Sequence, residues 1–259
     1  MRVALLGYGR FGRAFVDLLI RAGGEVRVHD PHAAVPPELS AGTAVAAVAG
    51  AQWIVLAMPV PMMRDAMQAL RAHLNPGQTV IDVGSVKLHP CEMMDEILGA
   101  EIPHAGTHPL FGPLSLARGD PLRAVVCASA RHPQAAMHAR QLFFDMGCEV
   151  IEQDPATHDR AMARTHALAF FIAKGLVDMG VDDDLTVAPP SFLGLKNMLA
   201  AVRGDAGHLF AAIQQENPFA AEERARLIDA LSVIHGRLLV EADREGSLAI
   251  PARGERELG

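Results

Sequence analysis

The stretch "RVALLGYGRFG", residues 2–12, decides the fold that this sequence predicts. A run typical of a β-strand leads directly into three glycines at the start of a helical pattern. Gly7 would permit a tight turn, Gly9 would let the backbone approach a pyrophosphate, and Gly12 would let the helix pack closely on the strand. Unpaired N–H groups at the start of that helix would meet the phosphate charge. The stretch therefore predicts a dinucleotide-binding turn between a strand and a helix.

An acidic residue at the end of the second predicted strand supports this interpretation. Asp30 follows "EVRVH", residues 25–29, and lies eighteen residues beyond Gly12. A carboxylate at this place would accept hydrogen bonds from the adenosine ribose and repel a 2′-phosphate. The pattern therefore favours NAD over NADP. Arg10 and Phe11 lie inside the glycine turn and are further candidates for contact with the dinucleotide.

The pattern of strands and helices divides the chain into two parts. Strand-like runs alternate with helical segments as far as residue 154, which predicts a Rossmann-type, mainly parallel sheet in an α/β domain over residues 1–154. The predicted strands are 2–6, 25–29, 53–57, 79–83, 101–105, 123–128 and 148–152. Residues 155–259 offer no convincing strand but four helical stretches, near 156–180, 191–203, 205–215 and 218–244. We expect an all-α domain over 155–259, with a frayed end at 250–259.

Composition narrows the classes of partner. The 259 residues carry a formal charge of −7, and the pI is near 5.9, which argues against a nucleic-acid or anionic-membrane binder. No stretch approaches the length and apolarity of a signal peptide or membrane span, so we expect a soluble, cytoplasmic protein. The three cysteines show no metal-type spacing, which predicts reduced core thiols and no metal site.

The helical part carries more apolar surface than one small domain needs. Apolar or small residues recur at three- or four-residue spacing at Met162, Thr165, Ala169, Ile172 and Leu176. Around Phe170 and Phe171 the predicted helix is apolar on more than one face. We expect a homodimer through this domain; packing against the first domain alone is the alternative.

Two polar side chains follow neighbouring predicted strands. Ser85 lies in "DVGSVK", residues 82–87, and His108 lies in "GTHPLFGP", residues 106–113. Ligands of open parallel sheets collect at the carboxyl ends of the strands, so both residues should face the nicotinamide. A neutral imidazole with a pKa of about 6.5 can take a proton from an alcohol as hydride leaves its carbon. We expect His108 to act as the base, Ser85 to hold it or the alcohol, and activity to fall below the pKa of His108.

These two motifs resemble the prephenate and arogenate dehydrogenase family. The resemblance extends to the glycine turn, to "HDRAMARTHALA" (158–169) and to "ENPFA" (216–220), so it covers nearly the whole chain. It implies oxidative decarboxylation of a cyclohexadienyl dicarboxylate in tyrosine biosynthesis, with hydride passing to nicotinamide. It also implies that His108 binds the ring C4 hydroxyl and takes its proton, with Ser85 assisting, and that the helical domain forms an intertwined dimer.

Two positions depart from the family pattern. The family often carries a histidine three residues after the position of His166, and an arginine near Ala200, but this chain has alanine at both places, Ala169 and Ala200. The substrate carboxylates still need partners in an acidic protein. The candidates are His166, Lys196 and Arg203, with Lys87 and Arg164 as further cations.

Other interpretations remain open. Lys174 could serve as the acid and base of a β-hydroxyacid dehydrogenase, although that class does not explain "GTHPLFGP". The departures could mark a substrate with an amine in place of the C4 hydroxyl, 4-amino-4-deoxyprephenate, or a nucleotide-binding regulator without activity. We interpret the adjacent His158 and Asp159 as capping residues of the first helix of the second domain.

Overall fold

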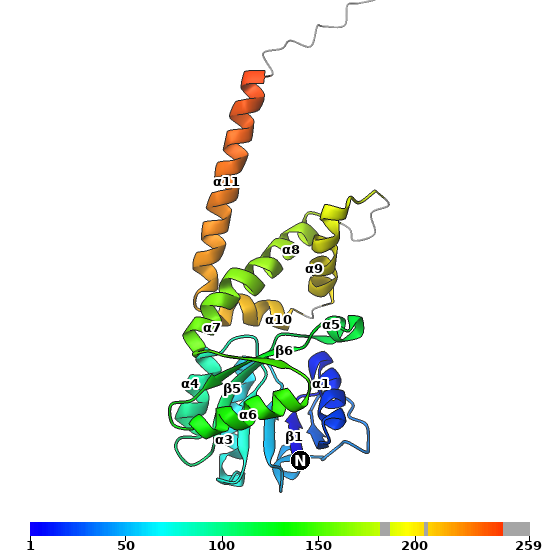
Figure 1. Ribbon diagram of the computed structural model, residues 1–259, viewed down its shortest axis with the longest axis vertical. Coiled ribbons are helices and arrows are strands. Elements are labelled where there is room, and N and C mark those ends of the chain that lie inside the picture. The colour runs from blue at the N-terminus through cyan, green and yellow to red at the C-terminus, as the bar shows by residue number, and fades with distance from the viewer. Residues whose placement is uncertain (182–186, 205–206, 246–259) are drawn as a thin grey trace, which may run out of the picture.

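The computed structural model describes residues 1–181, 187–204 and 207–245. The start of the helix predicted at 205–215 and the predicted frayed end at 250–259 lie outside these described residues. The chain forms a sheet covered by helices, with a group of helices beyond the carboxyl ends of its parallel strands (Figure 1). One long helix, α11 (Ala220–Glu245), projects away from everything else.

The sheet has seven strands in the order β2-β1-β3-β4-β5-β6-β7. All neighbouring strands are parallel except β5 and β6, which are antiparallel. The mainly parallel, Rossmann-type architecture predicted from the sequence is therefore confirmed. The strands are β1 (Arg2–Leu6), β2 (Glu25–His29), β3 (Trp53–Leu56), β4 (Thr79–Asp82), β5 (His104–Pro109), β6 (Arg123–Ala128) and β7 (Glu149–Glu152).

Helices cover both faces of this sheet. One apolar core joins the sheet to α1 (Arg10–Arg21) and α6 (Pro133–Asp145), and the short α5 (Pro113–Arg118) lies beside α1. A second core on the other face joins it to α2 (Ala44–Val48), α3 (Val60–Leu70) and α4 (Leu88–Ile97). The central strands are apolar on both sides, as strands of a sheet covered on both faces must be.

The fifth strand differs from the predicted one. The predicted strand, 101–105, ends before the histidine motif, but β5 runs from His104 to Pro109 and includes His108. The reason is the antiparallel partner: β6 pairs with β5 from Ala105 to Pro109 and extends the strand beyond its pairing with β4. His108 therefore lies in the strand, opposite Val125, and does not follow it.

The helical part begins at α7 (Pro155–Met162), where the Asp154 side chain accepts a hydrogen bond from the Thr157 N–H at 2.9 Å. A π-helical segment, Ala163–Ala167, joins α7 to α8 (Leu168–Asp178). A 3₁₀ turn (Pro190–Phe192), α9 (Leu193–Arg203), α10 (His208–Ala211) and a second π-helical segment (Ala212–Glu216) follow before α11.

The continuous helix formed by α7, the first π-helical segment and α8 buries a row of residues that is shifted by one position along the chain from the predicted row. Ala163 is buried, and Ala167, Phe170 and Ala173 are buried in the core of the helical part, whereas Thr165 of the predicted stripe is exposed. The prediction assumed regular α-helical spacing, and a π turn holds an extra residue that shifts the phase of the helix.

The three cysteines form no disulfide. Within the described ranges, no helix is both long enough and apolar enough to cross a lipid bilayer.

Candidate active site

The glycine turn has the geometry that the sequence predicted for it. Gly7 has φ +113°, and a Cβ there would lie 2.3 Å from the carbonyl oxygen of Ala57. A Cβ on Gly12 would lie 2.4 Å from the carbonyl oxygen of Gly7. Gly9 differs from both, because the space around its missing Cβ is open. Gly9 is also the N-cap of α1 and offers no side chain to the first N–H groups of that helix. The turn therefore offers a phosphate both backbone N–H donors and the space in which to bind.

Asp30 follows β2 and fastens this turn. Its carboxylate accepts hydrogen bonds from the backbone N–H of Tyr8 at 2.7 Å, of His32 at 2.8 Å and of Ala33 at 2.9 Å. Partial burial acts to raise the pKa of Asp30, but these three hydrogen bonds outweigh it and lower the pKa below its ordinary value. A fixed carboxylate thus lies beside the glycine turn.

The two other residues of the turn point in different directions. The Arg10 guanidinium approaches the end of α9, because a Cβ on Gly204 would lie 3.0 Å from its Nη1 atom. The Phe11 ring packs inward, with its centroid 5.3 Å from that of Phe15 and 6.2 Å from that of Phe111. A contact from Phe11 to a dinucleotide would therefore use its backbone.

His108 is 5% exposed and is held by the second part of the chain. Its Nδ1 atom lies 2.9 Å from Nε2 of His158, and Nδ1 of His158 lies 2.7 Å from the Asp159 carboxylate. The same carboxylate accepts hydrogen bonds from the backbone N–H groups of Lys87 at 2.8 Å and of Leu88 at 2.9 Å. His158 and Asp159 are fully buried. A continuous polar chain thus joins β5, α7 and the start of α4.

Burial lowers the pKa of His108 well below 6.5, and the neighbouring His158, Lys87 and His166 lower it further. The ring is therefore neutral at physiological pH. The ring of His108 takes up a proton only well below pH 6.5. We therefore expect activity to be lost at a lower pH than it would be with a histidine of ordinary pKa.

His158 and Asp159 are the residues whose role the sequence interpretation missed. They do not cap their own helix, because Asp154 does that. Asp159 instead holds the first N–H groups of α4, a helix from the other part of the chain. Two adjacent polar residues at fully buried positions of a helix need partners, but the sequence alone does not identify them.

Lys87 is not available to a substrate. It is fully buried, its ammonium is paired with the buried Asp82, and it donates to the carbonyl oxygen of Thr107 at 2.6 Å. The N–H of Thr107 in turn donates to Asp82 at 3.2 Å. The expectation that Lys87 could bind a substrate carboxylate is therefore wrong. A carboxylate in an otherwise apolar parallel strand, with a lysine five residues later, is the sequence signal for this pair.

His166 lies beside His108. Its ring centroid is 6.3 Å from that of His108 with the planes 18° apart, and it is 4.7 Å from that of Phe170 with the planes 86° apart. Burial, with a smaller contribution from His158, lowers the pKa of His166 to about 4. His166 belongs to the first π-helical segment, and the buried Gln214 donates a hydrogen bond to the Ala167 carbonyl oxygen of that segment at 2.7 Å. Such π turns occur often at functional sites.

The remaining predicted residues lie less centrally. Ser85 is half-buried in the loop between β4 and α4 and, among the described residues, makes no side-chain hydrogen bond to His108. On α9, Lys196 is exposed, and Arg203 donates to the carbonyl oxygen of Val181 at 2.7 Å. Arg164 is paired with Glu223 at 2.9 Å.

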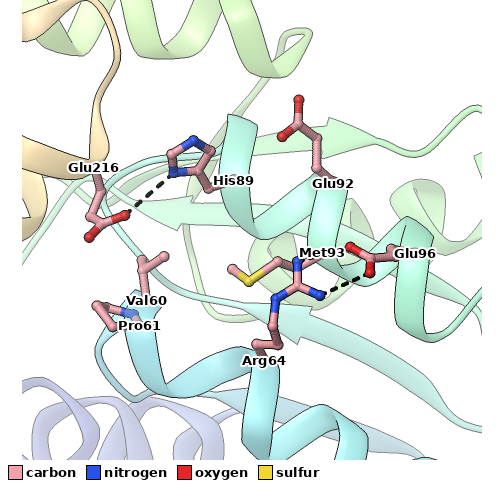
Figure 2. A pocket seen from close by; sticks show the side chains of 8 residues that line it. All are labelled: Val60, Pro61, Arg64, His89, Glu92, Met93, Glu96 and Glu216. Carbon is pink, nitrogen blue, oxygen red and sulfur yellow. Dashed lines mark hydrogen bonds and ion pairs between the residues drawn. The ribbon is translucent and has the colours of Figure 1, made fainter.

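A cavity of about 330 Å³ lies away from these residues, between the first turns of α3 and α4 and the end of the second π-helical segment (Figure 2). His89 of α4 reaches Glu216 across it at 3.4 Å, and Arg64 of α3 pairs with Glu96 at 2.9 Å. None of the predicted site residues lines this cavity. Its charged groups are mostly paired with each other, so we do not assign the chemistry to it.

Comparisons with known proteins find relatives over nearly the whole chain. The family described as prephenate dehydrogenase, nucleotide-binding domain, matches residues 37–120. The chain is 30% identical to 4-amino-4-deoxyprephenate dehydrogenase of Streptomyces pristinaespiralis, over 99% of this chain and 90% of that protein. It is 25% identical to a probable arogenate/prephenate dehydrogenase of Methanocaldococcus jannaschii, over 80% of this chain and 48% of that protein.

Solved structures have the same fold. A prephenate dehydrogenase from Aquifex aeolicus, in complex with hydroxyphenyl propionate and NAD⁺, superposes with a TM-score of 0.72 at 20% identity and covers 95% of this chain and 93% of its own. Arogenate dehydrogenase from Synechocystis superposes with a TM-score of 0.65 at 19% identity, over 95% of this chain and 99% of its own.

Proposed function

Because the chain belongs to the family of prephenate and arogenate dehydrogenases, which are oxidoreductases, we propose that it carries out NAD-dependent oxidative decarboxylation of prephenate or arogenate in tyrosine biosynthesis. One observation carries the proposal: a buried, neutral imidazole, that of His108, lies near the carboxyl end of β5 with a second imidazole, His166, facing it. Binding sites of open parallel sheets lie at this end of the strands.

The cofactor is NAD in this proposal. Gly9 leaves open space where a Cβ would otherwise block the approach of a phosphate, and the first N–H groups of α1 have no side-chain cap. Asp30 is held with its negative charge beside this turn, which suits ribose hydroxyls and repels a 2′-phosphate. Arg10 supports the phosphate side of the site. A bound nicotinamide would supply the acceptor for the hydride.

His108 acts as the base. Its neutral ring accepts the proton of the ring C4 hydroxyl as the C4 hydride leaves, and the C1 carboxylate is lost as carbon dioxide. The electron pair of the broken bond enters the ring, which becomes aromatic, and the proton can return to the oxygen. Ser85, in the loop after β4, orients the hydroxyl or the cofactor. Burial of His108 keeps water from protonating it between turnovers.

In this proposal the substrate carboxylates bind to residues of the helical part of the chain. We assign His166 to the substrate side of His108 because the two rings face each other. Lys196 and Arg203 flank Ala200 on α9 and supply positive charge there. Arg10 adds a third cation at the end of the same helix, near Gly204.

A second candidate substrate is 4-amino-4-deoxyprephenate. The relative with 30% identity over nearly the whole chain carries that name. The alanines at 169 and 200 also mark departures from the family pattern in the substrate region. With this substrate, His108 would take a proton from the C4 ammonium group instead of a hydroxyl.

Two rival interpretations have less support. Lys174, the acid and base of the β-hydroxyacid dehydrogenase hypothesis, is on α8 and forms an ion pair with Asp178, one turn away. A regulator without activity would have no use for a buried neutral imidazole near the carboxyl end of β5.

The test compares NADH formation from prephenate, arogenate and 4-amino-4-deoxyprephenate by the purified protein. The preferred substrate should give the highest kcat/KM, and His108→Ala should lower kcat by roughly 10²- to 10⁴-fold. No NADH from any of the three, or full turnover by His108→Ala, would refute the proposed function.

We also infer a homodimer. The outer length of α11 exposes large apolar side chains, about half of each being accessible: Ile228, Leu231, Val233, Ile234, Leu238, Leu239 and Val240. Figure 1 shows the outer length of this helix standing clear of the rest of the chain, whereas its first turns contact α8 and the two π-helical segments. An apolar helix of this length is not stable in water without a partner, and a second copy offers the same surface. Light scattering should give twice the chain mass of 27.6 kDa, and Leu231→Glu with Leu238→Glu should yield monomers.

A further inference from the structure

We propose that His158 and Asp159 position His108 by fixing which of its ring nitrogens carries hydrogen. The proposal rests on the proposed function, in which His108 is the base. It assigns a role to two residues of the helical part that do not reach the substrate themselves.

The hydrogen positions follow from the order of donors and acceptors along the chain. Asp159 already accepts two backbone N–H groups, and a carboxylate can only accept from the ring next to it. Nδ1 of His158 must therefore carry hydrogen and donate it at 2.7 Å. In the form of His158 that carries hydrogen on Nδ1 alone, Nε2 has a lone pair, and His108 donates to it from Nδ1 across 2.9 Å. The neutral ring of His108 is left with its lone pair on Nε2.

That result matters because a base needs its lone pair on the nitrogen that faces the substrate. Nδ1 of His108 is occupied by His158, so Nε2 is the nitrogen left for a substrate. With the reverse arrangement, hydrogen would lie on Nε2 and His108 could only donate. The pair from α7 thus decides whether the histidine of β5 is a base.

Burial and the neighbouring His158, Lys87 and His166 oppose a positive charge on the ring of His108, whereas the carboxylate of Asp159 lies at the end of its hydrogen-bond chain. The groups that surround His108 are Lys87 from the loop before α4, His166 from the π-helical segment, and His158 with Asp159 from α7. The Lys87 charge opposes an imidazolium, although Asp82 of β4 largely balances it. Asp159 is the acidic residue that joins His108 through hydrogen bonds, and such charge-assisted bonds are about twice as strong as neutral ones.

The pair is also fixed in place across the two parts of the molecule. Asp159 holds the first turn of α4, and Asn217 donates a hydrogen bond to the Asp159 carbonyl oxygen at 2.8 Å. Movement of α7 away from α4 would therefore separate His158 from His108. Rigid placement of the supporting groups is what keeps a base in its productive orientation.

Three variants separate positioning from structural support. Asp159→Asn replaces the charge-assisted hydrogen bond to Nδ1 of His158 with a neutral one, and its NH2 group must face one of the backbone N–H groups of Lys87 and Leu88, so the hydrogen positions are held less firmly; kcat should fall at least about tenfold. His158→Gln can still accept from His108 but cannot carry charge, so it should keep more activity than His158→Ala. Because His158 is one of the neighbours that lower the pKa of His108, the acid limb of the kcat/KM profile of His158→Gln should also move to higher pH.

The control is Asn217→Ala, which removes a hydrogen bond to the Asp159 backbone without touching the chain of side chains. It should lower the thermal midpoint and leave the midpoint of the acid limb where it is in the wild type. If Asp159→Asn and His158→Gln behave like Asn217→Ala, with losses that follow stability and no change in the acid limb, the positioning role is refuted.

A readout independent of activity keeps this test separate from that of the proposed function. Nitrogen-15 NMR of the histidine rings, with the His108 signals assigned by their absence in His108→Ala, should find hydrogen on Nδ1 in the wild type and a larger share of it on Nε2 in Asp159→Asn. Hydrogen on Nε2 of wild-type His108 overturns the proposal whatever the activity. Full turnover by His108→Ala overturns the proposed function instead.

Discussion

Replacing His166 by phenylalanine tests the electrostatics of the site through the stability of the protein. The ring of His166 packs against Phe170, and a phenyl ring of similar shape keeps that contact while removing the group that titrates. Burial lowers the pKa of His166 from 6.5 to about 4, so the folded chain resists its protonation. Between these two values the unfolded chain binds a proton that the folded chain does not, and wild-type stability falls as the pH falls.

The size of the effect follows from the difference between the two pKa values. One pKa unit corresponds to about 1.4 kcal/mol, which gives at most about 3 kcal/mol near pH 4. The side chain of His166 is only half-buried, so water screens part of this effect. The expected difference in the free energy of unfolding is therefore about 2 to 3 kcal/mol. His166→Phe should therefore lose that much less stability than the wild type between pH 6.5 and 4.

Urea unfolding at several pH values between 7.5 and 4 measures this difference directly. His138→Gln is the matched control, because His138 is an exposed histidine of α6 far from the site in the sequence. Its stability should fall with pH in parallel with the wild type. If His166→Phe also follows the wild-type curve, His166 is not held neutral by its surroundings, and its assigned place beside His108 would have to be given up.

Three further substitutions test the cofactor site and the buried ion pair. Asp30→Asn keeps an acceptor for the backbone but removes the charge, so the ratio of kcat/KM for NAD to that for NADP should fall; an unchanged ratio would mean that the ribose is recognised elsewhere. Gly9→Ala enters open space, so stability should be retained while the Kd for NAD rises by at least about tenfold; unchanged affinity would contradict the phosphate-binding turn. Lys87→Met leaves Asp82 buried without its partner and should cost about 3 to 5 kcal/mol in urea unfolding, most of it restored by adding Asp82→Asn. A higher KM at unchanged stability would instead indicate a substrate contact.

Much of the fold could be predicted because local signals agree with it. The first two strands and the sixth have the bounds that their alternating or continuous apolar runs predict. Gly7 and Gly12 are required by close contacts that no side chain could tolerate, so their spacing is a reliable signal. The end of β5 could not be predicted in the same way, because it depends on pairing with β6, a strand fourteen or more residues further along the chain.

The partners of His108 could not be predicted because they are contacts between distant segments. His158 lies fifty residues from His108, and Asp159 lies more than seventy residues from the N–H groups that it holds. Local reasoning assigns an acidic residue near a helix start to that helix, since the dipole favours it there. In this protein the helix that benefits is α4, and the signal for that assignment exists only once the two parts of the chain are packed together.

The π-helical segment explains why the spacing of family motifs is a poor guide to the substrate side of this site. Residue counts along "HDRAMARTHALA" assume regular turns, and on that basis Ala169 leaves the site short of an imidazole. The extra residue of the π turn changes which side chains face the first domain. His166 is brought to a ring distance of 6.3 Å from His108, and Gln214 holds the Ala167 carbonyl group that the turn displaces. In the proposed function, a substrate between the sheet and the helical part would therefore meet one imidazole from each, and we propose that the cations of α9 and Arg10 contribute to its selectivity.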